Sequence, residues 1–246
     1  MNDSKEQAIK STTCEFTYDW YRNFLQGLND ADRNFTTYDG EIETGDVLLR
    51  HDVDLSVERA VRMAEIEAAE GVQATYFLLV TTKMYNLLND EVRERVSRIR
   101  SLGHNIGLHF STHQYYEEEP RTKSLVKRIE IERQIFKMAT GIPVDTVSFH
   151  IPPDWVLRQS FDDFVSTYEE RFFSEISYRG DSNQRWRNDP PFDSGYPEKL
   201  QILVHPGLWG ENDREFEDCV HRAVDNVAES VDTFANRQYI EDELSG

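Results

Sequence analysis

The sequence predicts an α/β fold built on a largely parallel sheet. Short apolar runs alternate with longer amphipathic segments, and glycines follow several of the amphipathic segments. No internal repeat, low-complexity tract or linker interrupts this alternation. With 246 residues, of which 38 % are hydrophobic, the chain can bury a core and has the length of one α/β barrel. We therefore predict a single domain over residues 1–246, with its core over about residues 45–210.

Short apolar runs bounded by turn residues predict the strands of this sheet. They lie at Val47–Arg50, Ala74–Val80, Asn105–Phe110, Asp145–Phe149 and Gln201–His205. The segments that separate them can accommodate helices, which is the arrangement that joins parallel strands. We therefore expect these strands to lie parallel in one sheet.

The first predicted helix follows Ser56, whose side chain is typical of an N-cap residue. Its apolar stripe recurs at i, i+4, i+7 and i+11 and consists of Val57, Val61, Ala64 and Ala68. The stripe ends at Gly71, and glycine is the usual residue just past a helix C-terminus. The sequence therefore predicts a helix between the first two strands.

Two further helices are predicted at about Val92–Leu102 and at Thr122–Thr140, where Gly103 and Gly141 end them. We expect the longer helix to bury four apolar side chains: Leu125, Ile129, Ile135 and Phe136. Each of these helices again precedes a predicted strand, as an alternating α/β chain requires.

Amphipathic segments on either side of the core predict flanking helices. They cover Phe16–Leu28 and Phe216–Phe234, within about residues 15–30 and 212–237. Between the last two predicted strands, Gly180–Pro197 is rich in Asp, Asn and Pro, which favours a loop.

The charge of the chain limits its partners. Asp and Glu number 46 against 27 Lys and Arg, which gives a formal net charge of −19. Such a surface repels nucleic acids and anionic membranes, so we expect neither as a partner. Abundant acids with few lysines are typical of a halophilic cytoplasm, because the Debye length falls to about 3 Å at 1 M salt and crowded carboxylates repel one another less.

The chain carries no sequence signal for a membrane or for secretion. No apolar run approaches the ~18–20 residues of a membrane span, and Met1–Asp30 has no basic segment leading into an apolar stretch. Cys14 and Cys219 are too few for a disulfide framework. We therefore expect a cytoplasmic protein with reduced cysteines, and its oligomeric state stays open.

Polar groups follow three of the predicted strands, at the ends where α/β folds keep their sites. These groups are RHDVD at Arg50–Asp54, HFSTH at His109–His113 and LVHP at Leu203–Pro206. Each alone is a weak signal, because solvated strand ends and core histidines produce similar patterns. Their combination at C-terminal strand ends favours one shared site.

The residue types in these groups suit metal-assisted hydrolysis. Two imidazoles and a carboxylate can bind a divalent ion and leave positions open for water. A second carboxylate can accept a proton, and a separate histidine can donate one to a leaving amine. The chain contains no G-x-S-x-G elbow, phosphate-binding glycine loop or cysteine pair spaced for zinc.

Five segments in order, RHDVD, ATYFLL, GHNIGLHFSTH, SFHIPP and ILVHP, resemble the polysaccharide deacetylase superfamily, also called NodB-homology or carbohydrate esterase family 4. The resemblance covers about Val47 to Trp209. It implies a distorted (β/α)7 barrel that removes acetyl groups from N-acetylated sugars with a divalent metal, which we expect to be zinc.

By position, Asp52 resembles the family's catalytic base and His205 its general acid. The resemblance implies three metal ligands: Asp54, His109 and His113. Asp181 and Trp186 resemble the Asp/Trp motif that supports the acid histidine. We also assign substrate contacts to Arg50, Asp181, Trp186 and Trp209, where Trp155, Trp186 and Trp209 could stack on a sugar ring unless they pack in the core.

The sequence departs from the family pattern at two motifs. Val53 separates two aspartates that are usually adjacent, which is the pattern of an Asp-x-Asp branch that includes amidohydrolases of the allantoinase type. The usual Arg-x-Pro-Tyr motif reads His150-Ile151-Pro152-Pro153, and Pro153 has no N–H for an oxyanion hole. Either the metal takes over this catalytic role, or His150 supplies a replacement N–H, or the reaction differs. Arg50 either replaces the missing arginine or is a surface charge.

We predict a hydrolase that deacetylates an N-acetylated sugar or glycan precursor. Two alternatives stay open: an allantoinase-type hydrolase of a small cyclic amide, and a non-catalytic carbohydrate-binding relative. A nucleotide-sugar glycosyltransferase that used the two aspartates of HDVD would leave HFSTH and LVHP without a role.

Overall fold

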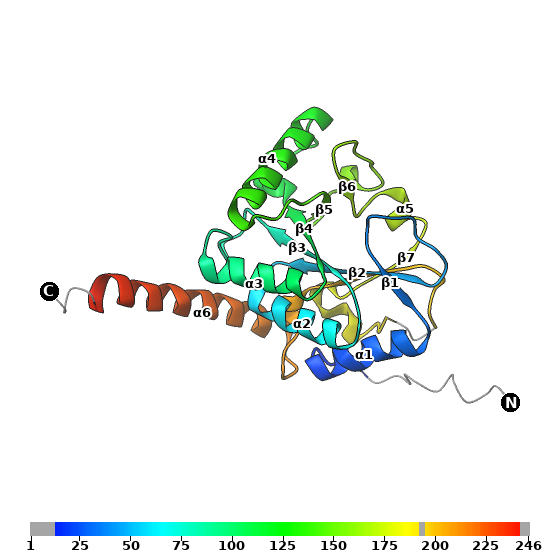
Figure 1. The fold of residues 1–246 in the computed structure, drawn as a ribbon, viewed down its shortest axis with the longest axis horizontal. Helices are drawn as coiled ribbons and strands as arrows, with labels where there is room; N and C mark the ends of the chain where they lie inside the picture. Colours follow the sequence, from blue (N-terminus) through cyan, green and yellow to red (C-terminus); the bar gives the residue numbers. More distant parts are fainter. Residues whose placement is uncertain (1–12, 192–194, 242–246) are drawn as a thin grey trace.

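The computed structural model, which describes residues 13–191 and 195–241, is built around a parallel sheet (Figure 1). Its strands are β1 (Asn34–Thr36), β2 (Asp46–Val53), β3 (Thr75–Leu79), β4 (Asn105–Phe110), β5 (Thr146–Phe149), β6 (Val165–Ser166), β7 (Ser177–Gly180) and β8 (Leu200–Val204). The spatial order is β6-β5-β4-β3-β2-β8-β7, and β1 pairs with β2 off this path. Every strand pair in the described residues is parallel, so the predicted α/β fold, a distorted (β/α)7 half-barrel, is confirmed.

The helices are α1 (Tyr18–Asp30), α2 (Val57–Ala69), α3 (Asp90–Ser101), α4 (Thr122–Thr140), α5 (Glu170–Phe173) and α6 (Phe216–Ala235). Helices α1 to α4 pack in succession, each against the next (Figure 1). Ser56 caps α2 as predicted, because its hydroxyl accepts a hydrogen bond from the Arg59 N–H at 3.3 Å. Gly141 ends α4 with a positive φ of 75°, which glycine adopts without strain.

The predicted strands and long helices are all present, and the differences have simple causes. Strands β1, β6 and β7 were not predicted because they are too short to show a period of two. The predicted loop Gly180–Pro197 contains a short 3-10 segment at Ser182–Arg187, and residues 192–194 lie outside the described residues.

One predicted core residue of α4 is wrong. Leu125, Ile129 and Phe136 are buried, whereas Ile135 is 42 % exposed. The buried stripe runs at i, i+4, i+7 and i+11 from Leu125, so its third position is Glu132, which is almost fully buried. The prediction looked only for apolar residues and therefore assigned Ile135, rather than Glu132, to the buried stripe.

Strand β2 separates two interiors because successive side chains of a strand point to opposite faces. Leu48 packs with the cluster inside the half-barrel, and Arg50 and Asp52 share its side. Val53 belongs to the larger core between the sheet and the helices, and His51 points the same way. All residues of β2 are buried, so charged groups lie in both interiors.

The helix side of β2 holds a buried network centred on Glu67 of α2. Its Oε1 accepts hydrogen bonds from Tyr21 and from His51 Nε2, each at 2.5 Å. Its Oε2 accepts one from the Tyr76 hydroxyl at 2.7 Å, and His104 Nδ1 lies 3.6 Å from that oxygen. Burial alone would raise the pKa of Glu67, but His51 and the other partners hold it below its usual value.

Helix α6 extends away from the rest of the molecule (Figure 1). In α6, all of which the structure describes, Cys219 and Ala223 are the only buried residues. Cys14 and Cys219 are both buried free thiols. Among the described residues, no helix is long and apolar enough to span a membrane.

Candidate active site

Four parallel strands deliver polar side chains to one end of the sheet. Asp54 follows β2 directly, His109 is the penultimate residue of β4, His150 follows β5, and His205 follows β8. Because parallel strands align their carboxyl ends, these residues meet although they are far apart in sequence. This is the edge at which the sequence predicted a shared site.

Asp54, His109 and His150 form a close cluster. Asp54 Oδ1 lies 3.2 Å from His109 Nε2 and 3.2 Å from His150 Nδ1, and the two ring nitrogens are 3.2 Å apart. Despite these short distances, the buried Asp54 Oδ1 has no hydrogen bond of normal geometry in the described residues. The nearby histidines hold the pKa of Asp54 far below its usual value although burial opposes this.

This donor set fits a divalent metal ion. The three ligand atoms lie within 4.8 Å of one another, which allows all of them to contact one ion. Two imidazoles and one carboxylate leave open positions for water or substrate and suit zinc and neighbouring transition metals. The unsatisfied Asp54 Oδ1 is the kind of buried oxygen that a cation would satisfy.

The structure differs from the predicted ligand set at His113. That side chain is exposed, and its Nε2 lies 3.0 Å from the carbonyl oxygen of Ile151. The pair at i and i+4 would share a face only within one helix, but His109 is still in β4 and the 3-10 turn Thr112–Gln114 begins later. His150 occupies the third position of the cluster instead.

Asp52 is held beside the cluster by Arg50. The Arg50 Nε donates to Asp52 Oδ1 at 3.1 Å and its Nη2 donates to Oδ2 at 2.8 Å. Ser148 also donates to this carboxylate, at 3.2 Å and 3.3 Å. Burial would raise the pKa of Asp52, but Arg50 and the histidines keep it below its usual value, so the group is ionised.

Two predictions for Arg50 are corrected by its burial. The side chain is completely inaccessible, so it is neither a surface charge nor a direct substrate contact. Its remaining hydrogen bonds go to Thr167, Ser148 and Tyr168, at 2.7–2.9 Å. The alternative that Arg50 pairs with the carboxylate of Asp52, in place of the missing motif arginine, agrees with this geometry.

His205 is oriented by Asp181. Its Nδ1 donates to Asp181 Oδ1 at 2.6 Å, and its backbone N–H also donates to that carboxylate. This leaves Nε2 directed toward the cluster, 3.9 Å from Asp54 Oδ2. Burial lowers the pKa of His205, but Asp181 and Asp54 outweigh it and raise that pKa to about 9.

The tryptophans assigned to the substrate lie in the core instead. Trp186 and Trp209 are essentially inaccessible, and their rings pack 6.0 Å apart, so neither can stack on a sugar. Trp209 Nε1 donates to Asp181 Oδ2 at 2.8 Å. The Asp/Trp pair therefore exists, but its tryptophan is Trp209 rather than Trp186, and Asp181 supports His205 from a buried position without access to substrate. Trp155 is half-buried.

The backbone of the third motif supplies no oxyanion donor at the predicted positions. Pro153 has no N–H, and the His150 N–H donates to the Phe110 carbonyl at 2.9 Å. The His150 ring instead faces Asp54, which raises the pKa of that imidazole. His150 thus lies with Asp54 and His109 in the candidate metal cluster, a position that the sequence did not assign to it.

Several solved structures of carbohydrate esterase family 4 are similar to this chain. A family 4 acetyl xylan esterase from Clostridium thermocellum, solved with a cobalt ion, is 15% identical over 76% of this chain and 83% of that one, with a TM-score of 0.42. The catalytic domain of a peptidoglycan N-acetylglucosamine deacetylase from Eubacterium rectale is 13% identical over 81% and 90%, with a TM-score of 0.44.

A third similar structure is a family 4 pseudoenzyme from Bacillus anthracis, 16% identical over 78% of this chain and 62% of that one, with a TM-score of 0.44. No protein-family model and no curated protein matches the sequence. Similarity at this level of identity and TM-score does not assign an activity to this chain.

Proposed function

We propose that the chain is a metal-dependent hydrolase that removes acetyl groups from N-acetylated sugars. The observation that carries this proposal is the convergence of Asp54, His109 and His150 between a buried Asp52–Arg50 pair and a His205–Asp181 pair. A metal site flanked by one ionised carboxylate and one protonated imidazole has the parts that amide hydrolysis needs.

Asp54, His109 and His150 would hold the ion, for which zinc is our choice because imidazole nitrogen suits it. A bound divalent cation polarises a carbonyl oxygen and makes water more acidic. Asp52 is ionised and lies beside the cluster, with Oδ2 3.7 Å from His109 Nε2, so it can accept the proton of the attacking water. Arg50 fixes the orientation of that carboxylate.

His205 would protonate the departing nitrogen. Its Nδ1 is held by Asp181, so its Nε2 is the atom available to the site. A pKa of about 9 keeps the ring protonated at neutral pH, as a general acid requires. Asp181 acts here as a positioning residue, because it touches His205 and not the substrate.

One observation favours a second candidate, a non-catalytic carbohydrate-binding relative. Neither Pro153 nor the bonded His150 N–H can stabilise an oxyanion, and losing one such donor costs about 10²–10³ in rate. Metal binding does not separate the two candidates, because a site without turnover can still bind zinc. Turnover does.

The test combines metal content with acetate release. The wild-type protein should bind one equivalent of zinc and release acetate from N-acetylated sugars. Cyclic amides are assayed separately as substrates of the alternative function. Asp54→Ala and His150→Ala should lose most of the metal, because two remaining ligands hold an ion poorly. Asp52→Asn and His205→Ala should keep it and lose about 10²–10⁴ in rate.

His113→Ala is the matched control, since that histidine lies outside the cluster and should leave the metal content unchanged. Full metal with no turnover on any sugar would support the binding relative. Turnover on cyclic amides alone would support the allantoinase-type alternative. Equal metal content in all variants would remove the proposed site.

A further inference from the structure

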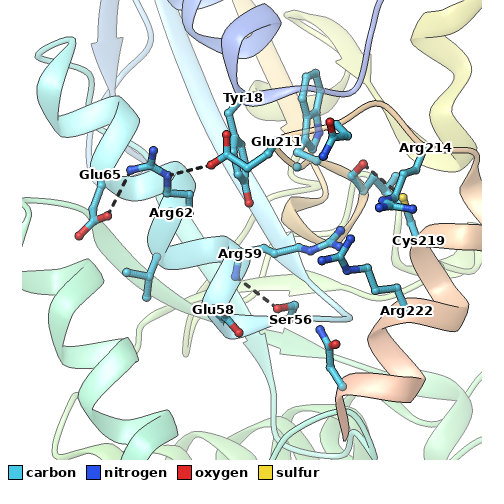
Figure 2. A pocket seen from close by; sticks show the side chains of 16 residues that line it. Tyr18, Ser56, Glu58, Arg59, Arg62, Glu65, Glu211, Arg214, Cys219 and Arg222 are labelled. Atoms are coloured by element: carbon cyan, nitrogen blue, oxygen red, sulfur yellow. Dashed lines mark hydrogen bonds and ion pairs between the residues drawn. The ribbon is translucent and has the colours of Figure 1, made fainter. Parts of the chain in front are cut away.

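A cavity of about 510 Å³ lies between α2, the segment 208–212 and the start of α6 (Figure 2). It contains none of the residues assigned above to metal binding or proton transfer. Four arginines line it: Arg59, Arg62, Arg214 and Arg222. In a chain with 19 more acidic than basic side chains, this concentration of guanidinium groups requires a physical explanation.

The charges in the cavity are unevenly placed. Arg62 lies 3.7 Å from Glu65 and 3.9 Å from Glu211, at one side of the cavity. On the other side, Figure 2 shows Arg59, Arg214 and Arg222 directed toward one another. In the described part of the chain, none of these three has a carboxylate within ion-pair distance. The Arg59 side chain donates to the Gly207 carbonyl at 2.5 Å and also contacts the Cys219 thiol, and neither partner is charged.

Neighbouring groups add to the positive potential at this point. Ser56, the N-cap of α2, lines the cavity, so the positive end of a helix of 13 residues faces it. Asn212 and Asn226 contribute amide donors to the lining. Glu58 is the one lining carboxylate not paired with Arg62, and its side chain is exposed.

We propose that this arginine cavity binds a phosphate-type oxyanion. Converging guanidinium groups repel one another unless an anion lies between them, and their planar N–H donors match phosphate oxygens in pairs. Such direct contacts persist at high ionic strength better than long-range attraction does. The expected ligand group is therefore a dianionic phosphate rather than a diffuse counterion.

Two chain segments contribute residues both to the candidate active site and to the cavity or its hydrogen bonds. Ser56 lies two residues after Asp54, and Gly207, which accepts from Arg59, lies two residues after His205. A phosphate on the sugar substrate and free inorganic phosphate offer the same chemistry to the arginines. Binding of a sugar phosphate rests on the proposed deacetylase function, whereas binding of phosphate to the arginines does not.

Calorimetric titration with inorganic phosphate at constant high potassium chloride tests the site. The wild-type protein should bind phosphate, and Arg222→Gln should weaken the affinity about tenfold or more, because a charge-assisted pair of hydrogen bonds is lost. Arg100→Gln is the matched control, an exposed arginine on α3 outside the cavity. Equal affinity in wild type and Arg222→Gln, or no binding to wild type, would overturn the proposal.

The source of the phosphate is tested by acetate release from N-acetylglucosamine and from its 1-phosphate. If the group belongs to the substrate, the phosphorylated sugar should have the lower KM, and Arg222→Gln should remove that preference. Phosphate binding without such a preference assigns the site to the free ion. Phosphate binding without turnover of either sugar overturns the deacetylase proposal and leaves the anion site intact.

Helix α6 carries an independent second feature, an unpartnered apolar stripe. Its members recur at alternating spacings of four and three residues, the pattern of a coiled-coil seam: Val220, Val224, Val227, Val231 and Phe234. Val224, Val231 and Phe234 are 49 %, 61 % and 58 % exposed. Packing against the body of the protein is confined to the first turns, where Cys219 and Ala223 are buried.

The residues beside this stripe favour a second copy of the chain as its partner. The flanking positions carry small or neutral side chains, chiefly Ala223, Ala228, Ser230 and Ala235. Four carboxylates of the helix, Asp218, Asp225, Glu229 and Asp232, lie away from the stripe, and only Glu217, in the first turn, lies in register with it. An acidic outer face repels anionic lipid, whereas a stripe without flanking acids beyond the first turn allows two highly acidic chains to approach.

We infer that this stripe pairs with the same stripe of a second copy; from Val220 to Phe234 it extends over about 20 Å. Sedimentation velocity should detect a dimer that Val231→Glu converts to monomer, while Glu229→Gln on the outer face remains dimeric. Circular dichroism and melting verify that each variant folds, which is expected because position 231 lies outside the core. A monomeric wild type at ~100 μM, or a dimeric Val231→Glu variant, would overturn the inference.

Discussion

Strand β2 places one buried charged cluster on each of its faces, and the carboxylates of the two clusters differ in how fully their oxygens are bonded. On the helix side, both oxygens of Glu67 accept hydrogen bonds, and Glu67 and His51 are inaccessible to solvent. On the other side, Asp54 Oδ1 has no hydrogen bond in the described residues, although two histidines lie 3.2 Å away.

This difference distinguishes a structural network from a binding site. A buried carboxylate with satisfied oxygens stabilises one arrangement of the elements around it. A carboxylate with an unsatisfied oxygen keeps bonding capacity for a ligand, and here Asp54 and the adjacent His150 are both partly exposed. Burial and charge are common to both clusters, so neither property alone identifies the site.

The largest expected effect comes from exchanging one carboxylate in each cluster. Glu67→Gln should lower the free energy of unfolding by about 3–5 kcal/mol, because it removes the charge that His51 faces in a buried pair. Asp54→Asn should lower it by less than Glu67→Gln does, because Asp54 is 22 % exposed and its Oδ1 makes no hydrogen bond of normal geometry, although its charge interacts favourably with His109 and His150. Denaturant unfolding gives the first quantity and elemental analysis the metal content, which only Asp54→Asn should reduce.

The reverse result, a stable Glu67→Gln and an unfolded Asp54→Asn, would break the comparison. Tyr38→Phe serves as a control for loss of a buried hydroxyl elsewhere, since that hydroxyl donates to Gln201 at 2.5 Å. It should cost about 1–2 kcal/mol, the ordinary range for one buried hydrogen bond.

The next effect is on the pH profile of turnover. Activity should fall as pH rises through about 9, because His205 must be protonated to act as an acid and its pKa is raised to about 9. Asp181→Asn removes the main cause of that rise, so the basic limb should move to lower pH by about one unit or more. A limb that stays in place would show that His205 does not control it.

Salt concentration should change the stability contribution of the surface charges but not that of the buried clusters. The net charge of −19 opposes folding when screening is weak, so the melting temperature should rise by several degrees between dilute buffer and molar potassium chloride. The stability difference between wild type and Glu67→Gln should be nearly independent of salt, because that network is buried. A flat melting temperature would contradict the prediction of a high-salt protein.

The smallest effect concerns Glu132, a third buried carboxylate. Burial raises its pKa to about 7, although Tyr115 donates to Oε1, and Oε2 has no partner in the described residues. A raised carboxyl pKa favours the folded state at low pH, and this contribution is lost as pH rises from about 4.5 to about 7. Glu132→Gln should therefore stabilise the protein by about 1 kcal/mol at pH 8 and by less at pH 4, as melting at both pH values would reveal.

The sequence predicted the central strands and the long helices because their hydrophobic periods are clear. Asn105–Phe110 and Thr122–Thr140 have the predicted bounds, since turn residues or glycine limit each of them. Strands of two to four residues have no detectable period, which is why β1, β6 and β7 were missed. The single-domain boundary and the site roles stay predictions.

The site could be predicted only where a side chain is fixed by a strand. Asp52, Asp54, His109 and His205 lie in a strand or directly after one, and the structure brings them together. His113 lies in the 3-10 turn after β4, whose path periodicity does not describe. His150 directly follows β5, but it stands where the resemblance implies a motif arginine, so nothing in the sequence placed it among the ligands. The burial of Arg50 and Trp209 could not be predicted from the sequence either. Both side chains are bonded to segments that are distant in sequence, Arg50 to Thr167 and Trp209 to Asp181.

The sheet is open along one side, since β6 and β7 are its edges and the described residues show no pairing between them. Arg50 spans the interior from β2 to Ser148 on β5 and to Thr167 and Tyr168 next to β6, so it forms a non-covalent cross-link between the middle of the sheet and one free edge. The same guanidinium fixes Asp52. A change in the width of the opening should therefore alter the orientation of that carboxylate, so the stiffness of an edge strand would affect the geometry of the candidate site.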